Sequence, residues 1–317
     1  MDTITIRQFK NNASKELERF TPSPELDVQV LLSHALKYDK TQLLLFAENH
    51  IPDDKLDWLN NAISLRKTGL PVAYITGVKE FYGYDFFVTP DVLIPKPDTE
   101  VLVERAMELI MEKIGSGGEV GTGSDAGTGA PSRPLKILDM CTGSGCIGLS
   151  VIKTLYALEK LPVENLPQMT MVDISEPALA IAKKNAAALL PDSEILQKIT
   201  FIQSDLFEKV DGEVDFILTN PPYVPSSMVD ELLKDGRNEP KLALDGDVDG
   251  TSLIKKLITQ SCKHLAQNGT ILMETGEYNA QTTADFAQTA GFATEIHRDL
   301  EGQMRVVEMR LSGQARQ

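Results

Sequence analysis

The sequence predicts an α/β fold in which a mostly parallel seven-stranded sheet carries an antiparallel hairpin at one edge and follows a small helical domain. Three observations lead to this expectation. The first 70 residues place apolar side chains at helical spacing and contain no alternating run. Beyond residue 134, short apolar segments alternate with helical stretches, as in parallel sheets covered on both faces. The last two apolar segments are separated only by a short turn at residues 300–302, which favours an antiparallel hairpin.

The strands are expected where short apolar runs lie between polar or glycine-containing stretches. Helices fit between the first three runs, around residues 251–266 and around residues 278–290. The seven expected strands are Leu135–Met140, Met169–Asp173, Ile199–Gln203, Val214–Thr219, Thr270–Glu274, Ala293–His297 and Arg305–Leu311.

The part before this sheet is expected to be a helical domain and a hairpin. Residues 1–70 form the helical domain, which we expect to dock the substrate, and residues 71–96 form a β-hairpin linker. The hairpin is expected from Ala73 to Val88, with Gly83 near its turn.

Residues 97–317 form the third part, which holds the sheet. Asp98 is expected to cap its first helix. Residues 115–134 contain almost no large apolar side chain, so we expect a flexible insertion there.

The bulk composition is that of a globular protein without a membrane span. Hydrophobic residues make up 42% of the 317 residues and charged residues 24%. Apolar runs such as 43–47 are far shorter than the roughly 20 residues of a membrane helix, and the start of the chain lacks a signal-peptide pattern. Cys141, Cys146 and Cys262 are not spaced as metal ligands. We therefore expect a cytoplasmic protein with no metal site.

The net charge of −15 bears on the partner. The chain has 46 acidic and 31 basic residues, whereas proteins that bind nucleic acid through its phosphates usually carry a basic surface. We therefore expect no direct nucleic-acid binding and a protein partner, preferably a basic one. We also expect a monomer.

A glycine-containing loop follows the first strand of the sheet. The strand ends at Asp139 and runs into a loop whose residues we expect to bind a cofactor: Cys141, Thr142, Gly143, Ser144 and Gly145. Glycine lets the backbone approach a ligand closely, and the N-terminus of the next helix favours an electronegative group. NAD, FAD and S-adenosylmethionine sites all use such loops, and a purely structural turn is the alternative. Asp139 and a spacing other than Gly-x-Gly-x-x-Gly favour a methyl-transfer cofactor.

Acidic residues also end the second and third strands. Asp173 is placed to accept both hydroxyls of a ribose. Asp205 could accept the amino group of adenine, while Leu206 covers the ring. A helix cap with core residues is the alternative for this second pair.

The most specific motif is Asn220-Pro221-Pro222-Tyr223, at the carboxyl end of the fourth strand. An amide or amino-aromatic NH₂ is a poor nucleophile because its lone pair is delocalised. The Asn220 side-chain oxygen and the Pro221 carbonyl can each accept one of its hydrogens and direct the lone pair at a sulfonium methyl. Two prolines restrict the backbone, and Tyr223 offers a ring face to the planar group. No general base is required.

These motifs resemble those of the release factor glutamine methyltransferases, the PrmC/HemK family. Asn-Pro-Pro-Tyr is shared by class I amino-methyltransferases acting on adenine, cytosine or glutamine. Three further stretches are similar to this family in particular, and the likeness covers nearly the whole chain except 115–134; the stretches are Pro71–Gly77 with Glu80–Gly83, Val92–Glu100, and Glu239–Gly246 with Asp249-Gly250.

The resemblance implies a class I S-adenosylmethionine-dependent methyltransferase fold, and as substrate the glutamine of the Gly-Gly-Gln loop in class-1 peptide-chain release factors. It implies that Cys141–Gly145 and Asp173 contact the cofactor and that Leu206 lies against adenine. Asn220 would touch cofactor and substrate, and Pro221–Tyr223 would complete the glutamine pocket. Cys141 replaces a common glycine, Lys96 a common arginine, and Leu206 an aromatic residue of some members.

Three alternatives remain open at this point. A glutamine methyltransferase of a ribosomal protein would share all of the chemistry. An adenine-N6 nucleic-acid methyltransferase shares Asn220–Tyr223 but would need a basic groove and a target-recognition domain. A binding module without activity would have no reason to keep Asn220–Tyr223 intact.

Overall fold

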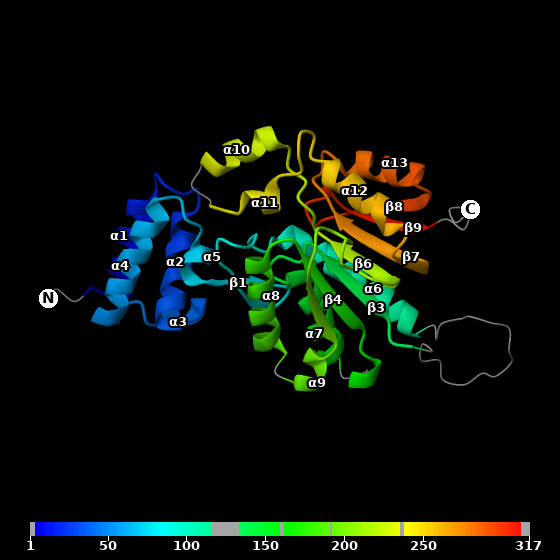
Figure 1. The fold of residues 1–317 in the computed structure, drawn as a ribbon. Helices are drawn as coiled ribbons and strands as arrows, with labels where there is room; N and C mark the ends of the chain where they lie inside the picture. The colour runs from blue at the N-terminus through cyan, green and yellow to red at the C-terminus, as the bar shows by residue number, and fades with distance from the viewer. Residues whose placement is uncertain (1–3, 116–132, 159–161, 191, 235–237, 312–317) are drawn as a thin grey trace. The chain divides into compact units, whose positions relative to one another are not determined.

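The computed structural model describes residues 4–115, 133–158, 162–190, 192–234 and 238–311. They form two compact units (Figure 1): the first runs through Val78 and includes Asp230–Glu239, and the second contains Lys79–Val229 and the chain from Pro240 onward. Of the insertion expected at 115–134, residues 116–132 lie outside the described residues.

Helices form the first unit. Their bounds are α1 Ile6–Leu17, α2 Pro24–Leu36, α3 Lys40–Leu45, α4 Asp53–Lys67 and α5 Val72–Thr76. Apolar side chains at helical spacing meet in one core, which includes Phe9, Leu17, Leu31 and Leu59. The side chains of Thr5 and Asp39 accept hydrogen bonds from the third residues of α1 and α3, which satisfies backbone donors at both helix starts. The predicted helical domain is confirmed.

The expected hairpin begins later than the sequence indicated. Val72–Thr76 form α5, and the two strands are β1 Val78–Phe81 and β2 Tyr84–Phe87. The expectation of a strand from Ala73 was wrong because Pro71 precedes a helical turn that Gly77 ends with a φ of 72°. Gly83, with a φ of 76°, lies in the turn between the two strands, as expected.

The second unit contains a seven-stranded sheet in the order β5-β4-β3-β6-β7-β9-β8. Neighbours from β5 to β7 are parallel, and β9 pairs antiparallel with both β7 and β8. This confirms the predicted fold class. The bounds are β3 Lys136–Met140, β4 Gln168–Asp173, β5 Ile199–Gln203, β6 Val214–Thr219, β7 Leu265–Glu274, β8 Phe292–Arg298 and β9 Met304–Leu311.

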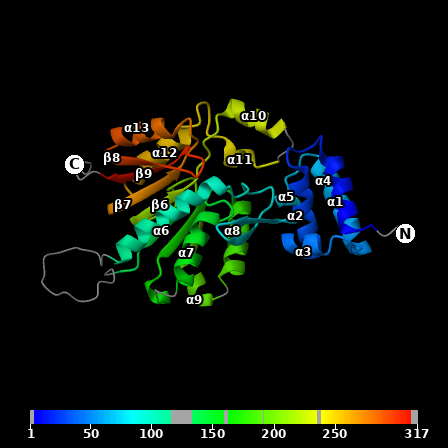
Figure 2. The ribbon, with the colours of Figure 1, turned by 180° about the vertical axis from the view of Figure 1, so that it is seen from behind.

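Helices cover both faces of this sheet (Figure 2). Alternate strand residues point to opposite faces: Ile137 and Phe216 pack with α6, α7 and α8, whereas Leu138 and Ile217 pack with α12 and α13. The helices of this unit are α6 Glu100–Gly115, α7 Cys146–Ala157, α8 Glu176–Leu189, α9 Ser193–Leu196, α11 Lys241–Leu244, α12 Ser252–Ser261 and α13 Ala280–Thr289, with 3₁₀ turns η1 Pro97–Thr99 and η2 Val163–Asn165. Helix α10, Ser226–Lys234, runs across the division between the units.

The start of α6 differs from the expectation for Asp98. This residue lies within η1, and its carboxylate pairs with Arg305 at 3.2 Å instead of capping the helix. Glu100 accepts a hydrogen bond from the Tyr82 backbone nitrogen at 3.0 Å. Both carboxylates therefore tie this segment to other parts of the second unit.

In the part of the chain that the structure describes, no helix combines the length and apolar character that crossing a membrane requires.

Candidate active site

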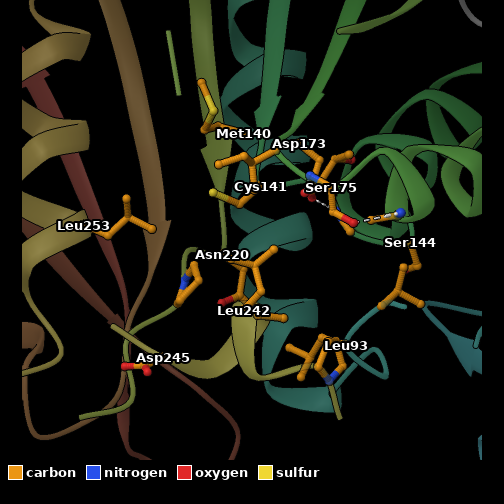
Figure 3. Close-up of a pocket in the computed structure, with 18 of the residues that line it drawn as sticks. Leu93, Met140, Cys141, Ser144, Asp173, Ser175, Asn220, Leu242, Asp245 and Leu253 are labelled. Carbon is orange, nitrogen blue, oxygen red and sulfur yellow. Dashed lines mark hydrogen bonds between the residues drawn. The ribbon is translucent and has the colours of Figure 1, made fainter. Parts of the chain in front are cut away.

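A cavity of about 620 Å³ opens in the second unit at the carboxyl ends of the parallel strands (Figure 3). Its position follows from the strand order, because β4 and β6 flank β3 on opposite sides and the chain crosses from β5 back past β3 to reach β6. Its size lies within the roughly 300–1,000 Å³ of small-molecule sites. The predicted site residues in its lining are Cys141, Thr142, Gly143, Ser144, Asp173, Asp205, Leu206, Asn220 and Pro222.

Hydrogen bonds to the buried carboxylate of Asp139 hold the loop after β3 in place. Asp139 is fully buried and accepts hydrogen bonds from the Thr142 hydroxyl at 2.6 Å and the Gly148 backbone nitrogen at 3.1 Å. Burial raises the pKa of its carboxyl to about 7. We expected Asp139 to bind the cofactor, but the structure places it beneath the loop, outside the cavity lining. In this position its two hydrogen bonds hold the loop in place.

Several residues of this site have left-handed backbone conformations. The φ angles are 60° at Cys141, 55° at Gly143, 83° at Gly145 and 48° at Leu206. Glycine adopts such angles without a steric cost, whereas Cys141 and Leu206 hold them with a side chain in place. Gly145 lies behind the cavity, where a Cβ atom would lie 2.9 Å from Leu149 Cδ1.

Asp173 connects the ends of β3 and β4. One carboxylate oxygen accepts from the Gly143 backbone nitrogen at 2.8 Å and the other from the Ser175 backbone nitrogen at 2.9 Å. Burial raises the pKa of this carboxyl, while the hydrogen bonds from Ser175 and Gly143 lower it. Because a carboxylate has about four acceptor positions, these bonds leave acceptor capacity for two ribose hydroxyls.

Asp205 and Leu206 lie on the cavity wall after β5. Lys256 of α12 contacts both carboxylate oxygens of Asp205, at 3.0 and 3.1 Å. Leu206 is buried and adds apolar surface. Lys256 also lines the cavity, which the sequence analysis did not predict.

Asn220 projects into the same cavity from the end of β6 (Figure 3), while its Nδ2 lies 3.4 Å from the Thr99 hydroxyl oxygen. The two prolines differ in position: Pro222 lines the cavity and Pro221 does not. Tyr223 was expected to face the substrate, but among the described residues it is not part of the lining. Its hydroxyl instead donates to Glu274 at 3.2 Å.

Two residues of this region were missed by the sequence analysis. Thr99 and Glu274 are 2% and 1% exposed; Thr99 lies beside Asn220 and lines the cavity, and Glu274 accepts from the Tyr223 hydroxyl. Burial raises the pKa of the Glu274 carboxyl to about 7, against the lowering effect of a hydrogen bond from Thr99. Glu274 ends β7 as Asp173 ends β4, so the rule used for Asp173 would have found it.

The segment after Tyr223 is fixed by a second loop. Val224 forms a parallel bridge with Asp245, and the Gly246 backbone nitrogen donates to the Val224 carbonyl at 2.8 Å. At Gly250, a Cβ atom would lie 2.2 Å from the Tyr223 carbonyl oxygen, so only glycine fits there. The stretch 239–250, for which the sequence suggested no role, therefore clamps the backbone that follows Asn220.

Comparison with known proteins agrees with this architecture. Residues 8–77 match the PrmC N-terminal domain, and residues 128–238 match the methyltransferase small domain. The release factor glutamine methyltransferase of Koribacter versatilis is 35% identical over 86% of this chain and 87% of its own, and that of Leptospira interrogans is 33% identical over 90% and 91%. Among solved structures, the hMettl16 catalytic domain aligns with a TM-score of 0.52 at 14% identity, covering 78% of this chain and 81% of that one.

The fold and the cavity at its strand ends define a class I methyltransferase. The chain belongs to the release factor glutamine methyltransferase family, PrmC/HemK. It is a methyltransferase, and its fold and family imply S-adenosylmethionine as methyl donor.

Proposed function

We propose that this protein methylates the side-chain amide nitrogen, N5, of the glutamine in the Gly-Gly-Gln motif of class-1 peptide-chain release factors. One observation carries the proposal: the Asn220 side chain shares a single cavity with the loop Cys141–Ser144 and with Asp173. A methyl donor held by that loop and an amide held by Asn220 would therefore meet in one place.

The residues of this cavity fit S-adenosylmethionine. The backbone of Cys141–Ser144 and the carboxylate of Asp173 would hold its amino-acid and ribose parts, with Asp205 and Leu206 beside adenine. When bound, the cofactor supplies an electrophilic methyl group on a sulfonium.

The amide nitrogen of the glutamine is a weak nucleophile, so the part of the cavity around Asn220 has to promote its reaction with the methyl group. The Asn220 side-chain oxygen, which lines the cavity, accepts one hydrogen of the glutamine NH₂ and holds the nitrogen in place. The Pro221 carbonyl is the second acceptor in this proposal, and because Pro221 does not line the cavity, it has to turn toward the substrate on binding. The bridge between Val224 and Asp245 and the close approach of Gly250 to Tyr223 fix the backbone that follows these two residues.

We assign substrate docking to the helical unit. Leu44 and Leu45 at the end of α3 are 69% and 73% exposed, and Leu26 on α2 is 58% exposed. Apolar side chains of this size on a surface are typical of protein contact sites when they cluster. Docking through this unit would leave the cavity of the second unit for the glutamine.

Methyl transfer from labelled S-adenosylmethionine tests the proposal. A purified release factor is compared with its Gln→Ala variant in the Gly-Gly-Gln loop, beside ribosomal proteins and DNA as other acceptors. We expect label on the normal factor alone. Label on ribosomal protein or DNA in place of the factor would contradict the substrate assignment.

A further inference from the structure

The backbone carbonyl of Tyr223 is a point where three segments of the second unit meet. It accepts hydrogen bonds from the Tyr278 hydroxyl at 3.2 Å and from the Asn279 Nδ2 atom at 3.3 Å. Gly250 packs against the same oxygen, where a Cβ atom would lie at 2.2 Å. Among the described residues Tyr223 is not part of the cavity lining, so these contacts hold the end of the Asn220–Tyr223 segment from outside the cavity.

The side chain of Asn279 joins this carbonyl to a second one. Its Nδ2 atom also lies 3.4 Å from the Gly250 carbonyl oxygen, and an amide NH₂ carries two hydrogens, one for each acceptor. Asn279 is 3% exposed and directly precedes α13, and its backbone nitrogen donates to the Gly276 carbonyl at 3.1 Å. Asn279 therefore ties the loop after β6 to the loop before α12 from a fixed place at the start of a third element.

The chemistry of this position calls for a donor. Both partners are carbonyl oxygens, which can only accept, so the NH₂ end of the Asn279 amide has to face them. The other end, Oδ1, is buried and has no hydrogen-bond partner within the described part of the chain. Because a buried acceptor without a partner lowers stability, the two donated hydrogen bonds are what explains an asparagine here.

A stiff connection links the Tyr223 carbonyl to Asn220. The two residues between them are Pro221 and Pro222, whose rings restrict the backbone φ to about −65°. With so little freedom in between, a shift of the Tyr223 carbonyl moves Asn220 as well. Asn220 and Pro222 both line the cavity, so such a shift would change the wall of the cavity itself.

We propose that Asn279 and Tyr278 are positioning residues, which hold the Tyr223 carbonyl and thereby keep Asn220 in the place from which its side chain reaches the methyl acceptor. This inference rests on the proposed function, in which Asn220 accepts a hydrogen from the glutamine amide. Misplacing a reacting group by about 1 Å can cost on the order of 10²-fold in rate, so contacts outside the cavity can control turnover without touching the substrate.

A pair of tyrosine variants tests the hydroxyl contact, with the full-length protein and a release factor as substrate. Tyr278→Phe removes one hydroxyl from a side chain that is 51% exposed, so the core is left intact. The control is Tyr84→Phe, which also loses one hydroxyl hydrogen bond, of 3.1 Å to Thr154, but neither of these residues lines the cavity.

A pair of asparagine variants tests the amide contact. Asn279→Asp keeps the size of the side chain but sets a carboxylate oxygen against two carbonyls. The matched variant is Asn185→Asp, because the fully buried Asn185 amide also donates to two backbone carbonyls, those of Phe87 at 3.0 Å and Ser144 at 2.8 Å. Ser144 belongs to the loop proposed to hold the cofactor, so the same chemical change is made beside the cofactor loop in one variant and beside the Asn220–Tyr223 segment in the other.

For each variant, kcat at saturating cofactor, the KM for cofactor and the thermal midpoint are measured. We expect Tyr278→Phe to lower kcat about three- to tenfold, the effect of one lost hydrogen bond, and Asn279→Asp to lower it about 10- to 100-fold, with the KM for cofactor unchanged in both. Asn185→Asp should instead raise the KM for cofactor, and Tyr84→Phe should keep kcat within about twofold of the wild type. A purely structural role of Asn279 and Tyr278 would lower the thermal midpoint and leave the kcat of the folded protein unchanged.

A wild-type kcat in Tyr278→Phe or in Asn279→Asp, a loss carried by the KM for cofactor, or an equal loss of kcat in Tyr84→Phe would overturn the inference. If Asn279→Asp does not fold, the comparison of Tyr278→Phe with Tyr84→Phe decides. The proposed function fails separately, if Asn220→Ala keeps full transfer to the glutamine. Loss of transfer in Asn220→Ala together with normal turnover in Tyr278→Phe and Asn279→Asp would remove only the positioning role.

Discussion

The two halves of the cavity are built in different ways. On the cofactor side, backbone hydrogen bonds of 2.8 and 2.9 Å fix Asp173 and the loop before α7. On the side of the cavity where the methyl acceptor would bind, Asn220 has one hydrogen bond, of 3.4 Å, to the Thr99 hydroxyl. We infer that binding of the cofactor relies on a rigid backbone, whereas turnover relies on the Asn220 side chain.

The largest expected effect is a loss of kcat on changing Asn220, on the side of the cavity where the methyl acceptor would bind. Asn220→Ala removes the acceptor that we propose for the reacting nitrogen, and loss of one such group costs about 10²–10³ in kcat. Cofactor affinity should change little, because backbone and Asp173 contacts remain. Steady-state kinetics with a release factor measures the first quantity and calorimetric titration the second. Full activity in this variant would refute the assignment of Asn220.

The next largest effect is a loss of cofactor affinity on changing Gly145, in the loop after β3. Gly145→Ala places a Cβ atom 2.9 Å from Leu149 Cδ1 and 3.1 Å from Met171 Cε, at a φ of 83°. A non-glycine residue at such an angle costs about 1–3 kcal/mol, which the free protein relieves by shifting the loop. Because the loop has to return to its shape to hold the cofactor, this cost is paid on binding, and cofactor affinity should fall about 5- to 100-fold. Gly302→Ala is the control for the angle alone, since nothing lies within 4 Å of its added Cβ. Equal affinities in wild type and Gly145→Ala would show that the loop is not rigid.

These two halves also differ in how far the sequence predicts them. The bounds of β5 and β6 were found to the residue, because each is a short apolar run whose ends are marked by polar residues. Loop residues 141–144 and Asp173 follow strand ends directly, and the structure brings them together in one cavity with Asn220.

The contacts around Asn220 could not be predicted from the sequence in this way. Thr99 and Asn220 are 121 positions apart, and their contact depends on how η1 packs beside β6. The Asp139 carboxylate likewise points beneath the loop because it accepts from the Gly148 backbone nitrogen, and the Tyr223 hydroxyl points to the buried Glu274 at the end of β7. These side-chain orientations depend on tertiary packing, which the spacing of residues along one strand does not predict.

The stability of the protein should report on the buried carboxyl of the acceptor side. Burial raises the pKa of Glu274 in the folded state to about 7, above its usual 4.5. The folded state then holds a proton that the unfolded state releases, so stability from this group falls as pH rises from about 4.5 to 7. Glu274→Gln removes the titration and should be more stable than wild type by about 1–3 kcal/mol at pH 8.

Urea unfolding at pH 5 and pH 8 measures this difference. The advantage of Glu274→Gln should shrink or vanish at pH 5, where both side chains are neutral in the folded protein. A pH-independent difference between the two proteins would contradict the raised pKa.

The smallest effect is expected at the outer wall of the cofactor side. Lys256 contacts both oxygens of Asp205, but these side chains are 44% and 40% exposed. Exposed ion pairs contribute about 0–1 kcal/mol, so Lys256→Met should change cofactor affinity by about fivefold or less. Titration at low and high salt checks this, with Lys255→Met on the same helix as the control. A loss of cofactor affinity as large as the one expected for Gly145→Ala would mean that Lys256 contacts the cofactor itself.

The contrast between the halves is tested most directly by measuring Asn220→Ala and Gly145→Ala side by side for both cofactor binding and methyl transfer at saturating cofactor. The account predicts opposite patterns: Asn220→Ala binds cofactor as the wild type does and transfers almost no methyl, whereas Gly145→Ala binds weakly and regains most of its turnover at saturation. Parallel loss of binding and turnover in both variants would contradict it.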